Sequence, residues 1–171
     1  MNIEIERKYK INDFDAIKAK IEEMGAKQES IKTTNDRYFE VPQRVARTKY
    51  LRIRFNDKSE NGTLAYHEVI DDLQTKEWEI DVDVAETAQQ ILEKIGFQPE
   101  VDVKKERIKY KFGEIEILLD KVDNLGSFIE IEAPGLEQLT KISQEIGVDK
   151  KDIISGAGYP DLIKEKNETS T

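Results

Sequence analysis

The first eleven residues, MNIEIERKYKI, place charged side chains at every second position: Glu4, Glu6, Lys8 and Lys10. Side chains alternate between the two faces of a β-strand, so one face of this strand would carry both carboxylates and both ammonium groups within about 20 Å. Paired carboxylates suit a hard divalent cation bound through oxygen, and lysine binds phosphate as a point charge. This strand therefore indicates metal and phosphate chemistry.

The same alternation recurs along the chain, but the sign of the charge differs from strand to strand. Apolar residues occupy the opposite face in most of these segments, as in LRIRF and EWEIDVDV. The basic faces comprise Arg52, Arg54, Lys105, Arg107 and Lys109, and the acidic faces comprise Glu77, Glu79, Asp81, Asp83, Glu114, Glu116, Asp120, Glu130 and Glu132.

Two arrangements could accommodate these ionised faces. An open antiparallel sheet with one wet face is the simpler explanation of a charged strand face. Exposed strand faces, however, usually mix Thr, Ser, Lys and Gln, whereas these faces are sorted by sign. The sorting favours a closed or nearly closed barrel with a charged interior, and the open sheet remains the alternative.

Composition limits the classes of function. The chain has 171 residues, enough for one domain with a core, and its net charge of -9 argues against nucleic acid as a partner. It has no cysteine, which excludes disulfides, thiol nucleophiles and cysteine metal sites. No apolar run is long enough to span a bilayer, so we expect no membrane partner and a cytoplasmic location.

Helical spacing of apolar residues predicts helices over 13–24, 86–95 and 136–146, each followed by a glycine. Alternation predicts strands over 2–11, 28–40, 50–56, 63–70, 76–84, 101–112, 114–121 and 127–133, with loops over 41–49 and 57–62. Trp78 is expected in the core beneath a helix. Residues 1–163 are interpreted as a single domain, and 164–171 as a disordered tail.

A metal site beside several cations is suited to a polyphosphate chain, because Mg²⁺ commonly bridges carboxylates to phosphates and arginine can hold two phosphate oxygens at once. The corresponding chemistry is phosphoryl or nucleotidyl transfer. Such reactions depend on positioning and charge neutralisation and need no protein nucleophile.

Several motifs resemble one family. The triplet Glu4-x-Glu6-x-Lys8 resembles the ExExK signature of the CYTH superfamily, the triphosphate tunnel enzymes. DRYFE (36–40), LRIRF (51–55), Lys105-x-Arg107, LDKVDNLGSFIEIE (119–132) and GYPDLI (158–163) follow in the family's order, so the resemblance covers residues 1–163. It implies an α+β fold: an eight-stranded antiparallel β-barrel with a charged lumen and helices packed outside.

The resemblance also implies roles for individual residues. A divalent ion, Mg²⁺ or Mn²⁺, is expected on Glu4, Glu6, Asp120, Glu130 and Glu132, and phosphate is expected on Lys8, Arg52, Arg54, Lys105, Arg107 and His67. The residues expected to take part in catalysis are Glu4, Glu6, Lys8, Glu77 and Glu79. His67 stands where the family usually has lysine. It is either a structural residue or a group that titrates near neutral pH.

The LGSFIEIE and GYPDL segments look most like class IV adenylyl cyclases, which convert ATP to cyclic AMP and pyrophosphate. The alternatives are a thiamine triphosphatase or tripolyphosphatase, a non-catalytic nucleotide or polyphosphate binder, and a structural sheet with a wet face. The expected partner is a small-molecule triphosphate, namely ATP, thiamine triphosphate or tripolyphosphate. A homodimer is compatible with the resemblance.

Overall fold

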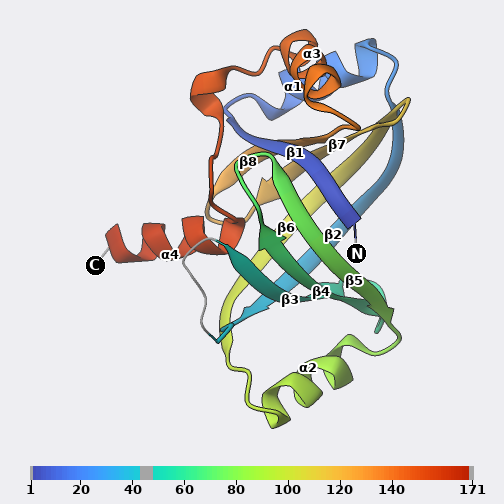
Figure 1. Cartoon of the computed structure of the whole chain (residues 1–171). Helices are drawn as coiled ribbons and strands as arrows, with labels where there is room; N and C mark the ends of the chain where they lie inside the picture. The colour runs from blue at the N-terminus through green and yellow to red at the C-terminus, as the bar shows by residue number, and fades with distance from the viewer. Residues whose placement is uncertain (1, 43–47, 170–171) are drawn as a thin grey trace.

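The computed structural model describes residues 2–42 and 48–169, with the side chains of 2–4 left out. Within these ranges, eight antiparallel strands close into a ring in the order β1-β5-β4-β3-β2-β6-β7-β8 (Figure 1). The strands are β1 (Asn2–Ile11), β2 (Lys27–Phe39), β3 (Lys49–Asn56), β4 (Gly62–Val69), β5 (Gln74–Val82), β6 (Pro99–Phe112), β7 (Ile115–Val122) and β8 (Gly126–Glu132). The expected α+β fold with a closed eight-stranded sheet is confirmed.

β1 closes the ring, because its two halves pair with different neighbours. Asn2 to Ile5 pair with β5, and Glu6 to Ile11 pair with β8. The charged N-terminal strand is therefore shared between the two ends of the sheet. Closure directs one face of every strand into a common interior, where alternate side chains from all strands meet.

Two apolar clusters lie outside the ring. The helices α1 (Phe14–Glu23) and α3 (Leu136–Ile146) pack Ile21, Leu139 and Ile142 onto the outer faces of β1, β6, β7 and β8. The helix α2 (Ala85–Lys94) packs Ala85 and Leu92 against Phe39 and Ile53 on the opposite side of the molecule. Figure 1 shows α1 and α3 together on one side and α2 on the other.

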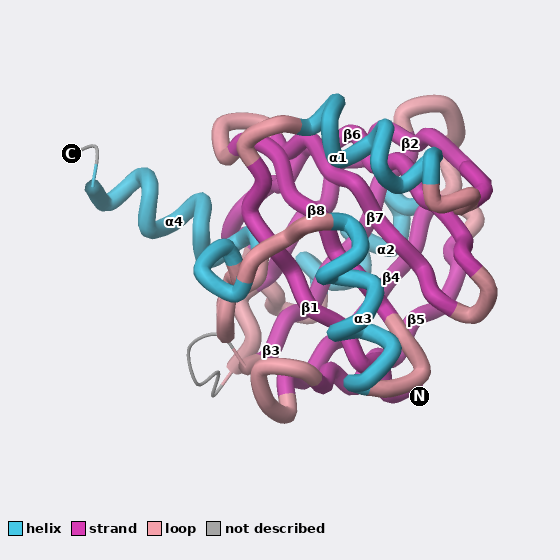
Figure 2. Tube along the Cα trace, turned by 90° about the horizontal axis from the view of Figure 1, so that it is seen from above, coloured by secondary structure: helices cyan, strands magenta, loops and turns pink. Residues whose placement is uncertain are grey.

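A third cluster lies inside one end of the ring. Val103, Val122 and Phe128 share strand faces with the inward-pointing charged residues, since they lie an even number of residues from them. They pack against Tyr159 in α4 (Tyr159–Thr169), together with Leu162 and Ile163 of the same helix. An apolar layer and α4 therefore fill this end of the interior. Figure 2 shows α4 extending away from the ring.

The structure differs from the sequence-based expectation in the C-terminal segment. Residues 164–169 continue α4, where a disordered tail was expected, and 170–171 lie outside the described residues. Lys164 pairs with Glu100 of β6, and Lys166 donates to the carbonyl of Asn124 in the turn between β7 and β8, so the two lysines connect the helix to the sheet. Local composition cannot reveal these distant partners.

Trp78 is a second difference, because it was expected in the core and is partly exposed. Its side chain is 39% exposed on the outer face of β5 and lies against Tyr66 of β4. The predicted loop over 41–49 falls partly on residues 43–47, which lie outside the described part. No helix among the described residues has the length and apolar character needed to cross a membrane.

Candidate active site

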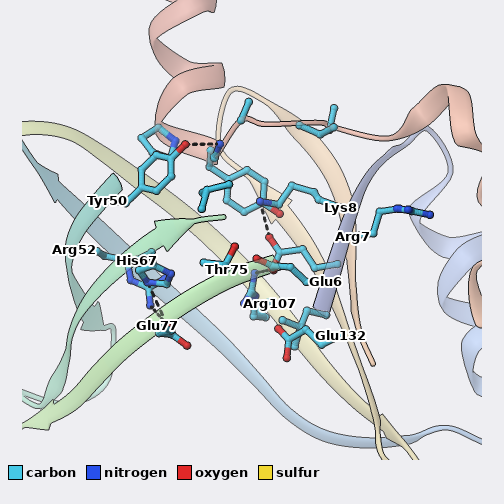
Figure 3. A pocket seen from close by; sticks show the side chains of 18 of the residues that line it. Glu6, Arg7, Lys8, Tyr50, Arg52, His67, Thr75, Glu77, Arg107 and Glu132 are labelled. Carbon is cyan, nitrogen blue, oxygen red and sulfur yellow. Dashed lines mark hydrogen bonds and ion pairs between the residues drawn. The ribbon is translucent and has the colours of Figure 1, made fainter. Parts of the chain in front are cut away.

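The interior of the ring contains a cavity of about 440 Å³, and all eight strands contribute side chains to its wall. The cavity brings together most of the residues singled out in the sequence, although they come from distant positions in the chain (Figure 3). These are Glu6, Lys8, Arg52, Arg54, His67, Glu77, Glu79, Lys105, Arg107, Glu130 and Glu132.

Three carboxylates on adjacent strands form a candidate metal centre. Glu6 of β1 and Glu130 and Glu132 of β8 each offer one oxygen, and these oxygens all lie within 4.8 Å of one another. Burial and repulsion from Glu130 and Glu6 raise the pKa of Glu132 to about 8. Burial and Glu130 also raise the pKa of Glu6. Carboxylates crowded in this way repel one another unless protons or a cation neutralise them, and three oxygen ligands suit Mg²⁺ or Mn²⁺.

Of the other two predicted metal ligands, Asp120 is not part of this group, and the position of the Glu4 side chain is not described. Asp120 is fully buried, and its two oxygens accept hydrogen bonds from Arg107 at 2.7 and 2.5 Å and from Tyr159 at 2.8 Å. Asp120 offers no oxygen to the group of carboxylates within 4.8 Å of one another, and its contacts orient Arg107. Glu4 lies in β1 opposite Thr75, but its side chain lies outside the described part.

The basic half of the cavity is organised by Asp36, a residue not singled out in the sequence. Its carboxylate lies 2.7 Å from Arg54, 3.2 Å from Lys105 and 3.5 Å from Arg52. Burial alone would raise the pKa of Asp36, but the three cations outweigh it and hold that pKa well below its ordinary value. Only the register that sets Asp36 opposite Arg54 could have indicated this role.

Glu130 joins the metal centre to the basic half. Its carboxylate lies 3.0 Å from Lys8 and 2.6 Å from Arg107. Burial opposes ionisation of Glu130, yet Arg107 and Lys8 keep its pKa well below the ordinary value. A metal ion held by Glu130 would therefore lie close to the cations available for phosphate, which is the arrangement that a metal–phosphate complex needs.

His67 lies between the basic half and the acidic strand β5. Burial and the nearby Arg52 lower the pKa of His67 to about 3, so the imidazole is neutral at physiological pH. Its Nε2 lies 3.1 Å from Glu77, and the contact is not an ion pair because the ring is uncharged. Glu79 accepts a hydrogen bond from Arg52 at 3.1 Å. His67 therefore does not supply the positive charge that the resemblance leads us to expect at this position.

A second cavity of about 540 Å³ adjoins the first at the end of the ring away from α4. The two cavities share Lys32, Arg54, Glu79 and Arg107 as wall residues. Asp81, Asp83, Asn56 and Asn61 line the remainder of the second cavity. The charged interior thus continues beyond the arginines, in the form of a tunnel.

Comparison with known proteins identifies a family and solved structures that share this fold. The model of the CYTH domain family matches residues 2–154. The chain belongs to the CYTH domain family. A protein of Methanocaldococcus jannaschii named "Putative adenylate cyclase MJ0240" is 30% identical over 164 residues, covering 89% of this chain and 94% of that protein. The matched range includes the whole carboxylate trio and the cations around Asp36, so the site described above lies within the CYTH domain.

Solved structures with the same fold include the PH1012 protein of Pyrococcus horikoshii OT3, which is 32% identical, with a TM-score of 0.82 and coverage of 93% of this chain and 98% of that one. A Hippeastrum protein, HpAC1, is described as a "putative adenylyl cyclase" with a dominant triphosphatase activity. It is 17% identical, with a TM-score of 0.68 and coverage of 97% of this chain and 96% of that one. At that identity the likeness concerns the fold.

Proposed function

We propose that this protein is a divalent-metal-dependent enzyme that acts on triphosphates inside the tunnel, and that its reaction is the conversion of ATP to cyclic AMP and pyrophosphate. The decisive observation is the position of Glu130, which contacts Lys8 and Arg107 and belongs to the carboxylate trio. One cavity thereby offers a metal centre and a phosphate site in direct contact.

The side chains divide the work of binding. Glu6, Glu130 and Glu132 would hold Mg²⁺ or Mn²⁺, and the bound ion would supply a Lewis acid that neutralises charge on phosphate oxygens. The cations that face the phosphate chain are Lys8, Arg52, Arg54, Lys105 and Arg107. Asp36 and Asp120 fix four of them before the ligand arrives, so little reorganisation accompanies binding.

The cyclase reaction forms a bond between the ribose 3′-oxygen and the α-phosphorus, and it breaks the bond from that phosphorus to the bridging oxygen. Pyrophosphate leaves with the bridging oxygen, and the 3′-hydroxyl proton must be accepted by a base. Glu77 and Glu79 line the cavity beside Arg52 and are the carboxylates outside the metal trio that we assign to this proton. The name of the Methanocaldococcus jannaschii relative supports this reaction.

Triphosphate hydrolysis is the second candidate, and the activity described for the Hippeastrum protein favours it. The same charges serve both reactions, since hydrolysis requires only that a water attacks the terminal phosphorus. The two reactions differ in which phosphorus lies opposite the attacking oxygen: the α-phosphorus in cyclisation and the terminal phosphorus in hydrolysis. The same charged side chains can hold the phosphate chain in either position.

A product assay distinguishes the candidates. The protein is incubated with ATP, thiamine triphosphate or tripolyphosphate in the presence of Mg²⁺ or Mn²⁺, and the products are separated by chromatography. Cyclic AMP with pyrophosphate is the expected result, and release of orthophosphate would assign the protein to hydrolysis. Metal-dependent binding without turnover would indicate a non-catalytic binder. The variant Glu130→Gln is the control, because loss of this carboxylate should abolish any genuine product.

A further inference from the structure

The aromatic ring of Tyr159 lies under two of the phosphate-facing cations. Lys8 Nζ lies 4.2 Å from the ring centroid, and Lys105 Nζ lies 5.1 Å from it. Both distances are within the range in which the negative face of an aromatic ring attracts a cation. The two lysines come from β1 and β6, which β7 and β8 separate in the closed sheet. One aromatic side chain thus contacts cations from two non-adjacent strands.

The hydroxyl of Tyr159 reaches a third cation indirectly. It donates to Asp120 at 2.8 Å, and Asp120 binds Arg107 through both oxygens. Tyr159 is 3% exposed, so these contacts are shielded from water. One residue of α4 is thereby connected to Lys8, Lys105 and Arg107.

Tyr159 is itself fixed at the beginning of α4. The neighbouring Asp161 accepts a hydrogen bond from Tyr50 at 2.5 Å and another from the backbone N–H of Gly158 at 3.0 Å. Phe128 packs edge-on against the Tyr159 ring, with the centroids 5.1 Å apart. The ring position is therefore determined by the strands as well as by the helix.

We propose that Tyr159 is a positioning residue of the triphosphate site, which makes the first turn of α4 part of that site. The inference rests on the proposed function, and it extends the site beyond residues 2–154, the range that the family model matches. The ring holds the ammonium groups of Lys8 and Lys105 in the cavity, and the hydroxyl holds Asp120 against Arg107. The ring gives each ammonium group a second contact, since Lys8 already lies 3.0 Å from Glu130 and Lys105 lies 3.2 Å from Asp36. Without the ring, each lysine would be held by its carboxylate alone and would be less firmly oriented toward phosphate.

The test compares Tyr159→Leu, Tyr159→Phe and Val122→Ala in the full chain. Tyr159→Leu removes ring and hydroxyl, Tyr159→Phe keeps the ring, and Val122→Ala disturbs the same buried apolar layer while keeping every contact of Tyr159 described above. Affinity for tripolyphosphate with Mg²⁺ is measured by calorimetry. We expect Tyr159→Leu to weaken binding by about tenfold or more and Tyr159→Phe by about threefold at most. Thermal melting of each variant reports whether it folds.

A second measurement detects the ring contact without a ligand. In lysine-labelled protein, the ring current of Tyr159 should shift the ε-methylene NMR signals of Lys8 and Lys105, and this shift should vanish in Tyr159→Leu and persist in Tyr159→Phe and Val122→Ala. Equal losses of affinity in Tyr159→Leu and Val122→Ala would overturn the positioning role, since both would then reflect disturbed packing. Failure of the wild-type protein to bind any triphosphate would instead overturn the proposed function, and the inference with it.

Discussion

At the scale of single residues, the site depends on buried charges that are partly unneutralised. Glu130 and Asp36 have close cations, whereas Glu132 has mainly other carboxylates as neighbours. Charges of one sign gathered in a low-dielectric interior oppose folding, and they persist where a ligand needs them. We therefore expect substitutions at these positions to affect ligand binding and stability in opposite directions.

Glu132→Gln should lower metal-dependent turnover by about 100-fold or more, because it removes a ligand oxygen from the trio. The same variant should be more stable than the wild-type protein at pH 8 without metal. The folded pKa of Glu132, about 8, exceeds the usual value of about 4.3, so the unfolded chain loses this proton first and wild-type stability falls as the pH rises between these values.

Thermal melting from pH 5 to pH 8 in chelator checks this prediction. The wild-type melting temperature should decline over the interval, and that of Glu132→Gln should decline less. Parallel curves for the two proteins would show that Glu132 ionises normally in the folded state.

Lys105 predicts a pH limit for phosphate binding. Burial and the nearby Arg107 lower the pKa of Lys105 to about 8, so its positive charge is lost as the pH rises through that value. Affinity for tripolyphosphate should then fall above about pH 8, and Lys105→Gln should be weaker at pH 7 with a flatter profile.

Lys109 is a matched control for Lys105, because it lies four residues further along the same face of β6. Burial disfavours its charge, but Glu116 outweighs burial and raises the pKa of Lys109. Lys109→Gln should therefore retain the decline above pH 8. The ligand's own titration affects the wild-type protein, Lys105→Gln and Lys109→Gln equally, so it cancels when their pH profiles are compared. A decline that persists in Lys105→Gln would assign the limit to another group.

At the scale of elements, the site needs neighbouring strands to approach closely, and Gly62 at the start of β4 is where this is most demanding. A Cβ atom at this position would lie 2.0 Å from the carbonyl oxygen of Arg54 and 2.9 Å from the side chain of Ala85. No rotamer change can relieve a clash with backbone. Any side chain here would push β4 away from β3 and from the first residue of α2.

Gly62→Ala should therefore lower the free energy of unfolding by about 3 kcal/mol and the melting temperature by roughly 6–12 °C. It should also weaken triphosphate binding, because Arg54 would move with its strand. Lys58→Ala, in the same loop and exposed, is the control and should change stability by less than about 0.5 kcal/mol. Equal melting temperatures for the two variants would contradict the prediction, because they would show that β3 and β4 accommodate the added methyl group at no cost in stability.

At the scale of the whole molecule, the closed ring places an acidic half and a basic half in one cavity, and each needs a ligand of opposite charge. Metal and triphosphate should therefore bind more tightly together than apart. A ligand at 100 times its dissociation constant stabilises the folded state by about 2.7 kcal/mol. This should raise the melting temperature by roughly 5–10 °C for a chain of this size.

Differential scanning fluorimetry with Mg²⁺, tripolyphosphate and both together measures this coupling. The joint shift should exceed the sum of the separate shifts. In Glu132→Gln the shift with tripolyphosphate alone should remain, while the contribution of Mg²⁺ should be lost. Strictly additive shifts in the wild-type protein would show that the two halves bind independently.

The sequence by itself determined most of the elements and the residues that face the interior. Helices end where Gly25, Gly96 and Gly147 follow an apolar repeat, and the observed bounds lie within one residue of those expected. Period-two alternation identified the strands, and the sorting of Glu130, Arg52 and their neighbours by strand indicated a closed interior. These features are local, since they depend on residues only a few positions apart.

Only the tertiary structure decided which charges pair and what α4 does. The role of Asp36 beneath three cations, the pairing of Asp120 with Arg107 and the ring of Tyr159 under Lys8 all join residues distant in sequence. The neutral state of His67 likewise depends on burial and on Arg52. Ionisation and coordination depend on distances of a few ångströms between strands, and these distances are set by the register and closure of the ring, which the alternation along any one strand leaves open.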